Sequence, residues 1–110
     1  MSPSFDADEP CAGDEPTTEP GALTRKLQIV NKKGLHARAS ARFVQTVEQF
    51  DAKVQVSRCG ESVGGDSIMG LMMLSAGPGT TITVAATGTQ AREVLDALAA
   101  LVASGFGEDE

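Results

Sequence analysis

The residues best suited to chemistry lie in the stretch Asn31–Ser40 (NKKGLHARAS), around the only histidine of the chain. His36 stands where an expected strand gives way to an expected helix. Gly34 lets the backbone turn sharply just before it, and the amides of Ala37 and Arg38 are helix N-terminal donors that lack partners within the helix. These donors predict a small anion site, to which the arginine adds a guanidinium suited to phosphate oxygens.

The chemistry that this site supports is phosphoryl transfer through the imidazole of His36. An imidazole beside a helix N-terminus has its charged form disfavoured, so it stays nucleophilic near neutral pH. A reactive N–P bond held by a few donors suits a carrier more than a hydrolase, because we find no second acid or base, metal ligand set or nucleophilic triad beside it. On local chemistry alone, however, a single histidine at a helix start is more often a capping or surface residue, and this interpretation stays open.

A second informative stretch, GDSIMGLMML over residues 65–74, joins a serine at an expected helix start to a run of methionines. On a short helix, Leu71 and Leu74 would face the core. Flexible thioethers on a surface suit the recognition of several partners, although the methionines are equally compatible with core filling. Ser67 is a candidate for regulatory phosphorylation or a plain N-terminal helix residue. The side chains expected to project outward are Ile68, Met69 and Met72.

Hydrophobic periodicity predicts seven elements that position these two stretches. A hairpin turn is expected at Cys59-Gly60, and Thr89 is expected to cap the last helix. Four strands alternating with amphipathic helices indicate a two-layer α+β domain, with one sheet covered by helices on a single side. The expected strands cover 23–31, 53–57, 61–63 and 80–86, and the expected helices cover 37–50, 68–74 and about 90–104.

The net charge of −6 is concentrated at the two ends of the chain. Residues 1–22 hold six acidic residues and no base, residues 105–110 hold three acidic residues, and the middle carries a net +3. Asp-Glu-Pro occurs twice in the first segment. We therefore expect a disordered acidic leader over 1–22, one folded domain over 23–105 and an acidic tail over 106–110.

The composition argues against several other classes of protein. Aromatic residues make up only 4% of the chain, with no Trp or Tyr, which disfavours a base-stacking nucleic-acid module. No apolar run approaches the roughly 20 residues of a membrane span, and the first residues lack the pattern of a secretory signal. Two cysteines lack metal-ligand spacing. We expect a cytoplasmic protein with no metal, no cofactor, no nucleic acid partner and no membrane contact.

The two motifs together resemble the HPr phosphocarrier family of the bacterial phosphotransferase system. Gly-Leu-His-Ala-Arg-Ala-Ser is followed about thirty residues later by Ser-Ile-Met-Gly-Leu-Met-Met-Leu, and the resemblance extends over roughly 24–105. These motifs and the ending Ser-Gly-Phe-Gly-Glu look most like the nitrogen-related, NPr-type branch. Many sugar-type members have Pro where this chain has Ala39, a departure that bears on the branch more than on the chemistry.

The resemblance implies a four-stranded antiparallel sheet with three helices on one face and a monomeric carrier rather than a free-standing enzyme. It implies that Nδ1 of His36 accepts phosphate from an enzyme I-type protein and passes it to an EIIA-type protein. Arg38 and the Ala37 N–H would steady the phosphoryl group, the three outward residues of the second stretch would dock partners, and an HPr kinase/phosphorylase would act on Ser67. The alternatives are a sugar-transport HPr, or a regulatory binding module that Ser67 switches without phosphotransfer.

Overall fold

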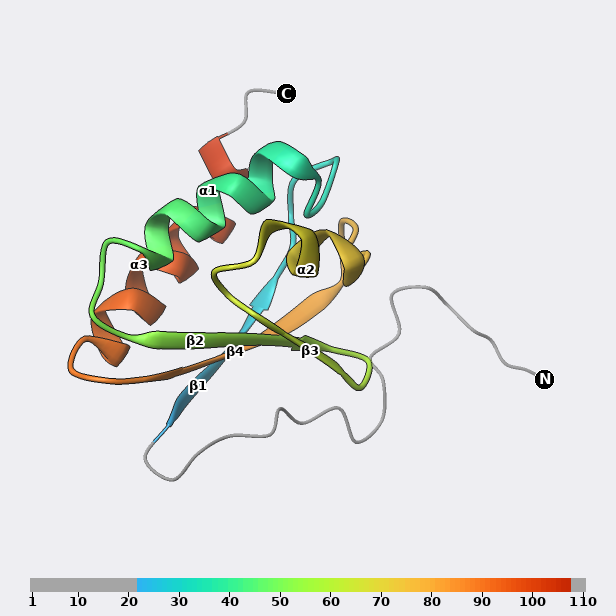
Figure 1. Cartoon of the computed structure of the whole chain (residues 1–110). Coiled ribbons are helices and arrows are strands. Elements are labelled where there is room, and N and C mark those ends of the chain that lie inside the picture. Colours follow the sequence, from blue (N-terminus) through green and yellow to red (C-terminus); the bar gives the residue numbers. More distant parts are fainter. Residues whose placement is uncertain (1–21, 108–110) are drawn as a thin grey trace.

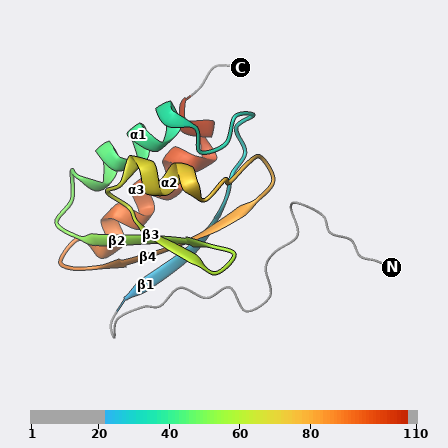
Figure 2. The ribbon, with the colours of Figure 1, turned by 45° about the vertical axis from the view of Figure 1, so that its right-hand side comes forward.

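The computed structural model describes residues 22–107. Within that range the four strands form one antiparallel sheet in the order β1-β4-β2-β3. The three helices lie on the same side of this sheet (Figures 1 and 2), so the predicted two-layer α+β fold is confirmed. The elements are β1 (Leu23–Gln28), α1 (Ala37–Val47), β2 (Lys53–Arg58), β3 (Glu61–Gly64), α2 (Ile68–Met73), β4 (Thr81–Thr87), α3 (Ala91–Ala103) and a 3-10 turn, η1 (Gly105–Gly107).

The core fills the space between the sheet and the helices. Successive strand residues point to opposite faces, and the inward residues of the central strands are aliphatic, as Val56 and Val84 show. The helices meet them with a buried stripe at helical spacing. The stripe of α1 includes Phe43 and Val47, and that of α3 includes Val94 and Leu98.

The turn between β2 and β3 is the expected hairpin. Cys59 (φ 53°) and Gly60 (φ 82°) both have positive φ, as the primed turns that match the twist of a two-residue hairpin require. The two strands pair from Arg58–Glu61 to Gln55–Gly64. This hairpin leads the chain into α2.

The predicted cap of α3 is wrong. Gln90, not Thr89, is the N-cap residue, and its side chain makes no capping hydrogen bond. The Thr89 hydroxyl instead donates to the Asp51 carboxylate (2.6 Å), and the Gln90 side-chain oxygen accepts from the Asp51 N–H (2.7 Å). The side chains of Thr89 and Gln90 therefore bond the loop before β2 rather than the first turn of α3.

Two predicted elements are shorter than expected. The first helix ends at Val47 rather than at 50, because the amides of Gln49 and Phe50 bond the carbonyls three residues back and tighten the chain into a turn. The first strand ends at Gln28 rather than at Asn31. After Gln28 the chain turns into the loop that holds the candidate site. After Val47 it turns into the loop that precedes β2.

The packed part of the chain continues past its expected end at 105. Phe106, assigned from the sequence to the acidic tail, is fully buried. Positive φ at Gly105 and Phe106 turns the chain back onto the helices, and the Arg42 guanidinium of α1 donates to the Phe106 carbonyl. The expectations for residues 1–21 and 108–110 lie outside the described residues.

Candidate functional site

The loop before α1 is fixed by backbone contacts with the turn that follows α2. Gly34 has φ +64°, and a Cβ there would lie 2.2 Å from the Ala76 carbonyl oxygen, so only glycine fits. The next residue, Leu35, is buried and donates its N–H to the same oxygen (3.0 Å). The buried Asn31 side-chain amide donates to the Gly34 carbonyl (2.9 Å). The backbone that leads into His36 is therefore held on both sides.

His36 is the N-cap residue of α1, in extended conformation (φ −77°, ψ −176°). Its Nδ1 atom accepts the Arg38 N–H at 3.2 Å, and its carbonyl accepts the Ser40 N–H at 2.8 Å. Because Nδ1 is the acceptor, the neutral ring carries its proton on Nε2. The lone pair of Nδ1 thus points at the positive end of an 11-residue helix.

The surroundings of the imidazole are open to solvent on one side. His36 is half-buried, whereas Ala37 and Arg38 are exposed. A shallow depression of about 230 Å³ lies beside the ring, lined by Lys33, Leu35, His36, Ser75, Ala76 and Gly77. The sequence did not single out Lys33 or Ser75. Ser75 has φ +55°, and no sequence signal marks a serine for that conformation.

The second predicted stretch forms α2, which packs against α1 and β3. Leu71 and Leu74 are buried, as expected. The predicted outward residues are exposed, Met69 by 70% and Ile68 and Met72 by 40% each, which removes the core-filling interpretation for them. Met73, 68% exposed, extends the same apolar surface and was missed.

This combination of a capping histidine and a methionine-rich second helix agrees with comparisons to known proteins. Residues 23–104 match the family described as "PTS HPr component phosphorylation site". The chain belongs to the HPr family of phosphocarriers. The phosphocarrier protein HPr of Cupriavidus necator is 50% identical over 88 residues, covering 80% of this chain and 99% of its own.

A relative named NPr and a solved HPr structure also match this chain. The phosphocarrier protein NPr of Shewanella violacea is 40% identical over 86 residues, covering 78% of this chain and 94% of its own. The crystal structure of HPr-C-His from Thermoanaerobacter tengcongensis superposes with a TM-score of 0.76 at 38% identity, covering 80% of this chain and 99% of that one. The fold is therefore that of HPr proteins.

Ser67 of this HPr-family chain caps α2. Its half-buried hydroxyl accepts the Gly70 N–H at 3.0 Å. We expect Ser67→Ala to lower the free energy of unfolding by about 1 kcal/mol, because the cap acceptor is lost. Ser67→Asp, which keeps an acceptor, is the matched control. Urea unfolding of both variants measures the effect, and equal destabilisation by the two would show that the cap contributes nothing.

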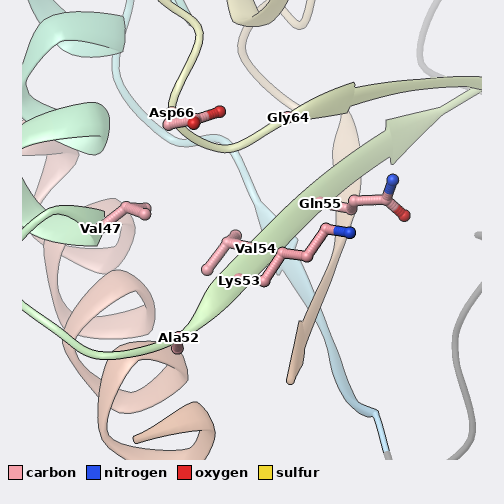
Figure 3. Close-up of a pocket in the computed structure, with 7 residues that line it drawn as sticks. All are labelled: Val47, Ala52, Lys53, Val54, Gln55, Gly64 and Asp66. Atoms are coloured by element: carbon pink, nitrogen blue, oxygen red, sulfur yellow. The ribbon is translucent and has the colours of Figure 1, made fainter. Parts of the chain in front are cut away.

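A separate hollow lies at the other end of α1, near the start of β2. It has a volume of about 290 Å³ and is lined by Val47, Ala52, Lys53, Val54, Gln55, Gly64 and Asp66 (Figure 3). It shares no lining residue with the depression beside His36. Across residues 22–107, no group of three or more His, Cys, Asp or Glu side chains is arranged to hold a metal ion, and no helix is long and apolar enough to cross a membrane.

Proposed function

We propose that the chain carries a phosphoryl group on Nδ1 of His36, taking it from an enzyme I-type protein and giving it to an EIIA-type protein. The observation that supports this most directly is the orientation of the ring. Nδ1 of a partly exposed histidine faces the Arg38 amide at 3.2 Å, at the N-terminus of α1. A group bound to that nitrogen would lie between solvent and the helix amides.

The proposed step is an in-line exchange of one phosphorus bond for another. The Nδ1 lone pair attacks phosphorus and forms the N–P bond, while the bond to the donor breaks and its electron pair leaves with the donor. The ring keeps its proton on Nε2 throughout, so the phosphorylated ring takes up the positive charge that Nδ1 gains when it bonds phosphorus. The N–H groups of Ala37 and Arg38, with the exposed guanidinium, then donate to the phosphoryl oxygens. Return of the phosphoryl group to an acceptor follows the same path in reverse.

The proposed docking surface consists of the outward residues Ile68, Met69 and Met72, which present apolar area beside α1. We expect Met69→Glu to lower kcat/KM for phosphoryl transfer about tenfold, because a charge would be buried against each partner. Its effect on stability should stay within about 0.5 kcal/mol, since the side chain is exposed. The measurement is the initial rate of phosphorylation by enzyme I.

Leu23→Glu provides the matched control for Met69→Glu. Leu23 is also exposed, by 40%, but it lies at the start of β1 and pairs with Ala86, whereas His36 follows the end of that strand. The control should transfer at the parent rate. Equal loss in the two variants would mean that added negative charge, and not the α2 surface, slows the reaction.

We assign the acceptor to the nitrogen-type regulatory branch, on the resemblance of the two motifs and on the NPr relative. A sugar-transport HPr is the competing assignment, and the relative that is 50% identical is named HPr rather than NPr. The purified phosphorylated chain, mixed in turn with a nitrogen-type and a sugar-type EIIA protein, separates the two. Faster transfer to the nitrogen-type acceptor supports our assignment, and the opposite order overturns it.

Phosphorylation of Ser67 by an HPr kinase/phosphorylase is part of the proposal. The hydroxyl lies one residue before the docking surface and at the start of α2. A phosphate there would place negative charge beside a surface that must approach a phosphorylated partner. If Ser67 acted as a switch without phosphotransfer, His36→Ala would leave the regulatory phenotype intact and Ser67→Ala would not. We also propose that the carrier is monomeric, because all the groups named belong to one chain. That it is cytoplasmic is proposed only on the resemblance to the bacterial phosphotransferase system.

The decisive experiment is incubation with phosphoenolpyruvate and a cognate enzyme I, followed by intact mass measurement. We expect a gain of about 80 Da, one phosphoryl group, which acid removes. An acid-stable adduct, or none, would contradict the proposal. Omission of enzyme I is the control for direct chemical phosphorylation.

A further inference from the structure

Within residues 22–107, every methionine lies on α2 and is exposed to solvent. Met69 and Met73 are 70% and 68% exposed, and Met72 is 40% exposed. The one remaining methionine of the sequence, Met1, lies outside the described residues. The buried position of the same helix is filled by Leu71, so the oxidisable sulfur atoms of α2 belong to its outer surface and the core side chain of α2 has none.

The exposed apolar side chains of α2 form two neighbouring rows. Residues four apart lie on the same side of a helix, one turn from each other. Met69 and Met73 therefore form one row, and Ile68 and Met72 form the other. Three of these four side chains belong to the proposed docking surface, and Met73 extends it. A partner that covers this surface buries thioether groups.

A thioether differs from an aliphatic side chain of similar size because it can be oxidised reversibly. A hydroperoxide, such as hydrogen peroxide, transfers one oxygen atom to the sulfur. The O–O bond breaks, the sulfur gives up two electrons, and the rest of the peroxide leaves as water. The product is a polar sulfoxide. A methionine sulfoxide reductase reverses the change with two thiols, which become a disulfide while the oxygen leaves as water.

We propose that Met69, Met72 and Met73 are reversible oxidation sites, and that their conversion to sulfoxides weakens partner docking. This inference rests on the proposed function, because it requires α2 to contact the phosphoryl donor and acceptor. A sulfoxide oxygen buried against an apolar partner surface would lack a hydrogen-bond donor, and such burial opposes binding. The fold itself should be unaffected, because the oxidised side chains are exposed in the isolated chain.

The test compares the parent chain with a triple variant that carries Met69→Leu, Met72→Leu and Met73→Leu. Leucine keeps the surface apolar, and its volume and helix propensity are close to those of methionine. Each chain is treated with hydrogen peroxide, which is removed before enzyme I and phosphoenolpyruvate are added. The parent should gain about 16 Da more per α2 methionine than the triple variant gains, one oxygen atom each. Met1 and both cysteines are common to the two chains, so their oxidation cancels in the comparison.

Oxidation should lower kcat/KM for phosphorylation of the parent by enzyme I about tenfold or more, because the docking surface has become polar. The same treatment should change kcat/KM of the triple variant by less than about twofold. Methionine sulfoxide reductases A and B with dithiothreitol, one enzyme for each sulfoxide epimer, should restore both the mass and the rate of the oxidised parent. The midpoint of its urea unfolding should be the same before and after oxidation.

Three results would overturn this inference alone. One is an equal rate for the oxidised and unoxidised parent, and another is an equal loss in the triple variant, which would place the sensitive group outside α2. The third is a lower urea midpoint after oxidation, because slower transfer would then report unfolding. Failure of the unoxidised parent to accept phosphate is a different result. It would contradict the proposed function, and the inference would fall with it.

Discussion

Replacement of His36 by Ala is expected to abolish phosphoryl acceptance. The chain has no other histidine, so no second imidazole can take the role. The attacking atom, Nδ1, is removed together with its hydrogen bond from the Arg38 amide. Incubation with phosphoenolpyruvate and enzyme I should leave the mass of the variant unchanged under conditions that shift the parent by about 80 Da, one phosphoryl group.

His36→Asn separates the chemical role of this residue from its capping role. An N-cap side chain contributes about 1 kcal/mol to helix or protein stability, so His36→Ala should also melt at a lower temperature. Asn can accept the Arg38 N–H but cannot form the phosphohistidine. We therefore expect His36→Asn to recover stability and to remain unlabelled. Acid-labile labelling of His36→Asn at the parent rate would contradict the assignment of Nδ1 as the acceptor.

The capping role and the proposed phosphocarrier role of His36 are compatible, which the sequence could not establish. From the sequence, a histidine at a helix start was either a cap or a reactive group. The structure has Nδ1 accepting the Arg38 N–H, so the cap itself points the lone pair toward the helix amides. The bond that stabilises the first turn is also the one that a phosphoryl group on Nδ1 would replace.

Local patterns predicted the helices and strands and placed His36 and Ser67 at helix starts, because alternation, helical spacing and glycine turns depend on near neighbours. Contacts between distant segments were not predictable in this way. Thr89 bonds Asp51 instead of capping α3, and Phe106 is buried because Arg42 and two positive-φ residues hold it against the helices. Ser75 joins the surroundings of His36 only because the turn after α2 returns to the loop before α1.

The contact between the turn after α2 and the loop before α1 underlies the second large expected effect, which is the loss of stability in Gly34→Ala. The new Cβ would lie 2.2 Å from the Ala76 carbonyl oxygen and 2.8 Å from the Gly77 Cα, both backbone atoms, at φ +64°. Neither contact is relieved by rotating a side chain, so the two loops must separate. We expect a loss of about 3 kcal/mol or more in the free energy of unfolding, measured by urea titration.

Substitutions at two other glycines separate the two causes of the stability loss in Gly34→Ala, which are the positive φ and the clash with backbone atoms. Gly60→Ala meets no atom within 4 Å but has φ +82°, so it should cost about 1 kcal/mol, the strain of a left-handed alanine. Gly77→Ala meets no atom and has no positive φ, so it should change stability by less than about 0.5 kcal/mol. The difference between the stability losses of Gly34→Ala and Gly60→Ala measures the cost of the clash with the Ala76 backbone, apart from the strain of the positive φ.

Gly34→Ala also tests whether the contact between this loop and Ala76 matters for phosphoryl transfer. Separation of the loops would break the Leu35 N–H bond to Ala76, one residue before His36, and would shift the ring relative to the helix amides. A misplacement of about 1 Å lowers rates on the order of a hundredfold, so folded Gly34→Ala should accept phosphate far more slowly than Gly60→Ala of the same folded concentration. Parent-like rates in folded Gly34→Ala would mean that the ring finds its geometry from the helix alone, and that the Ala76 contact serves stability only.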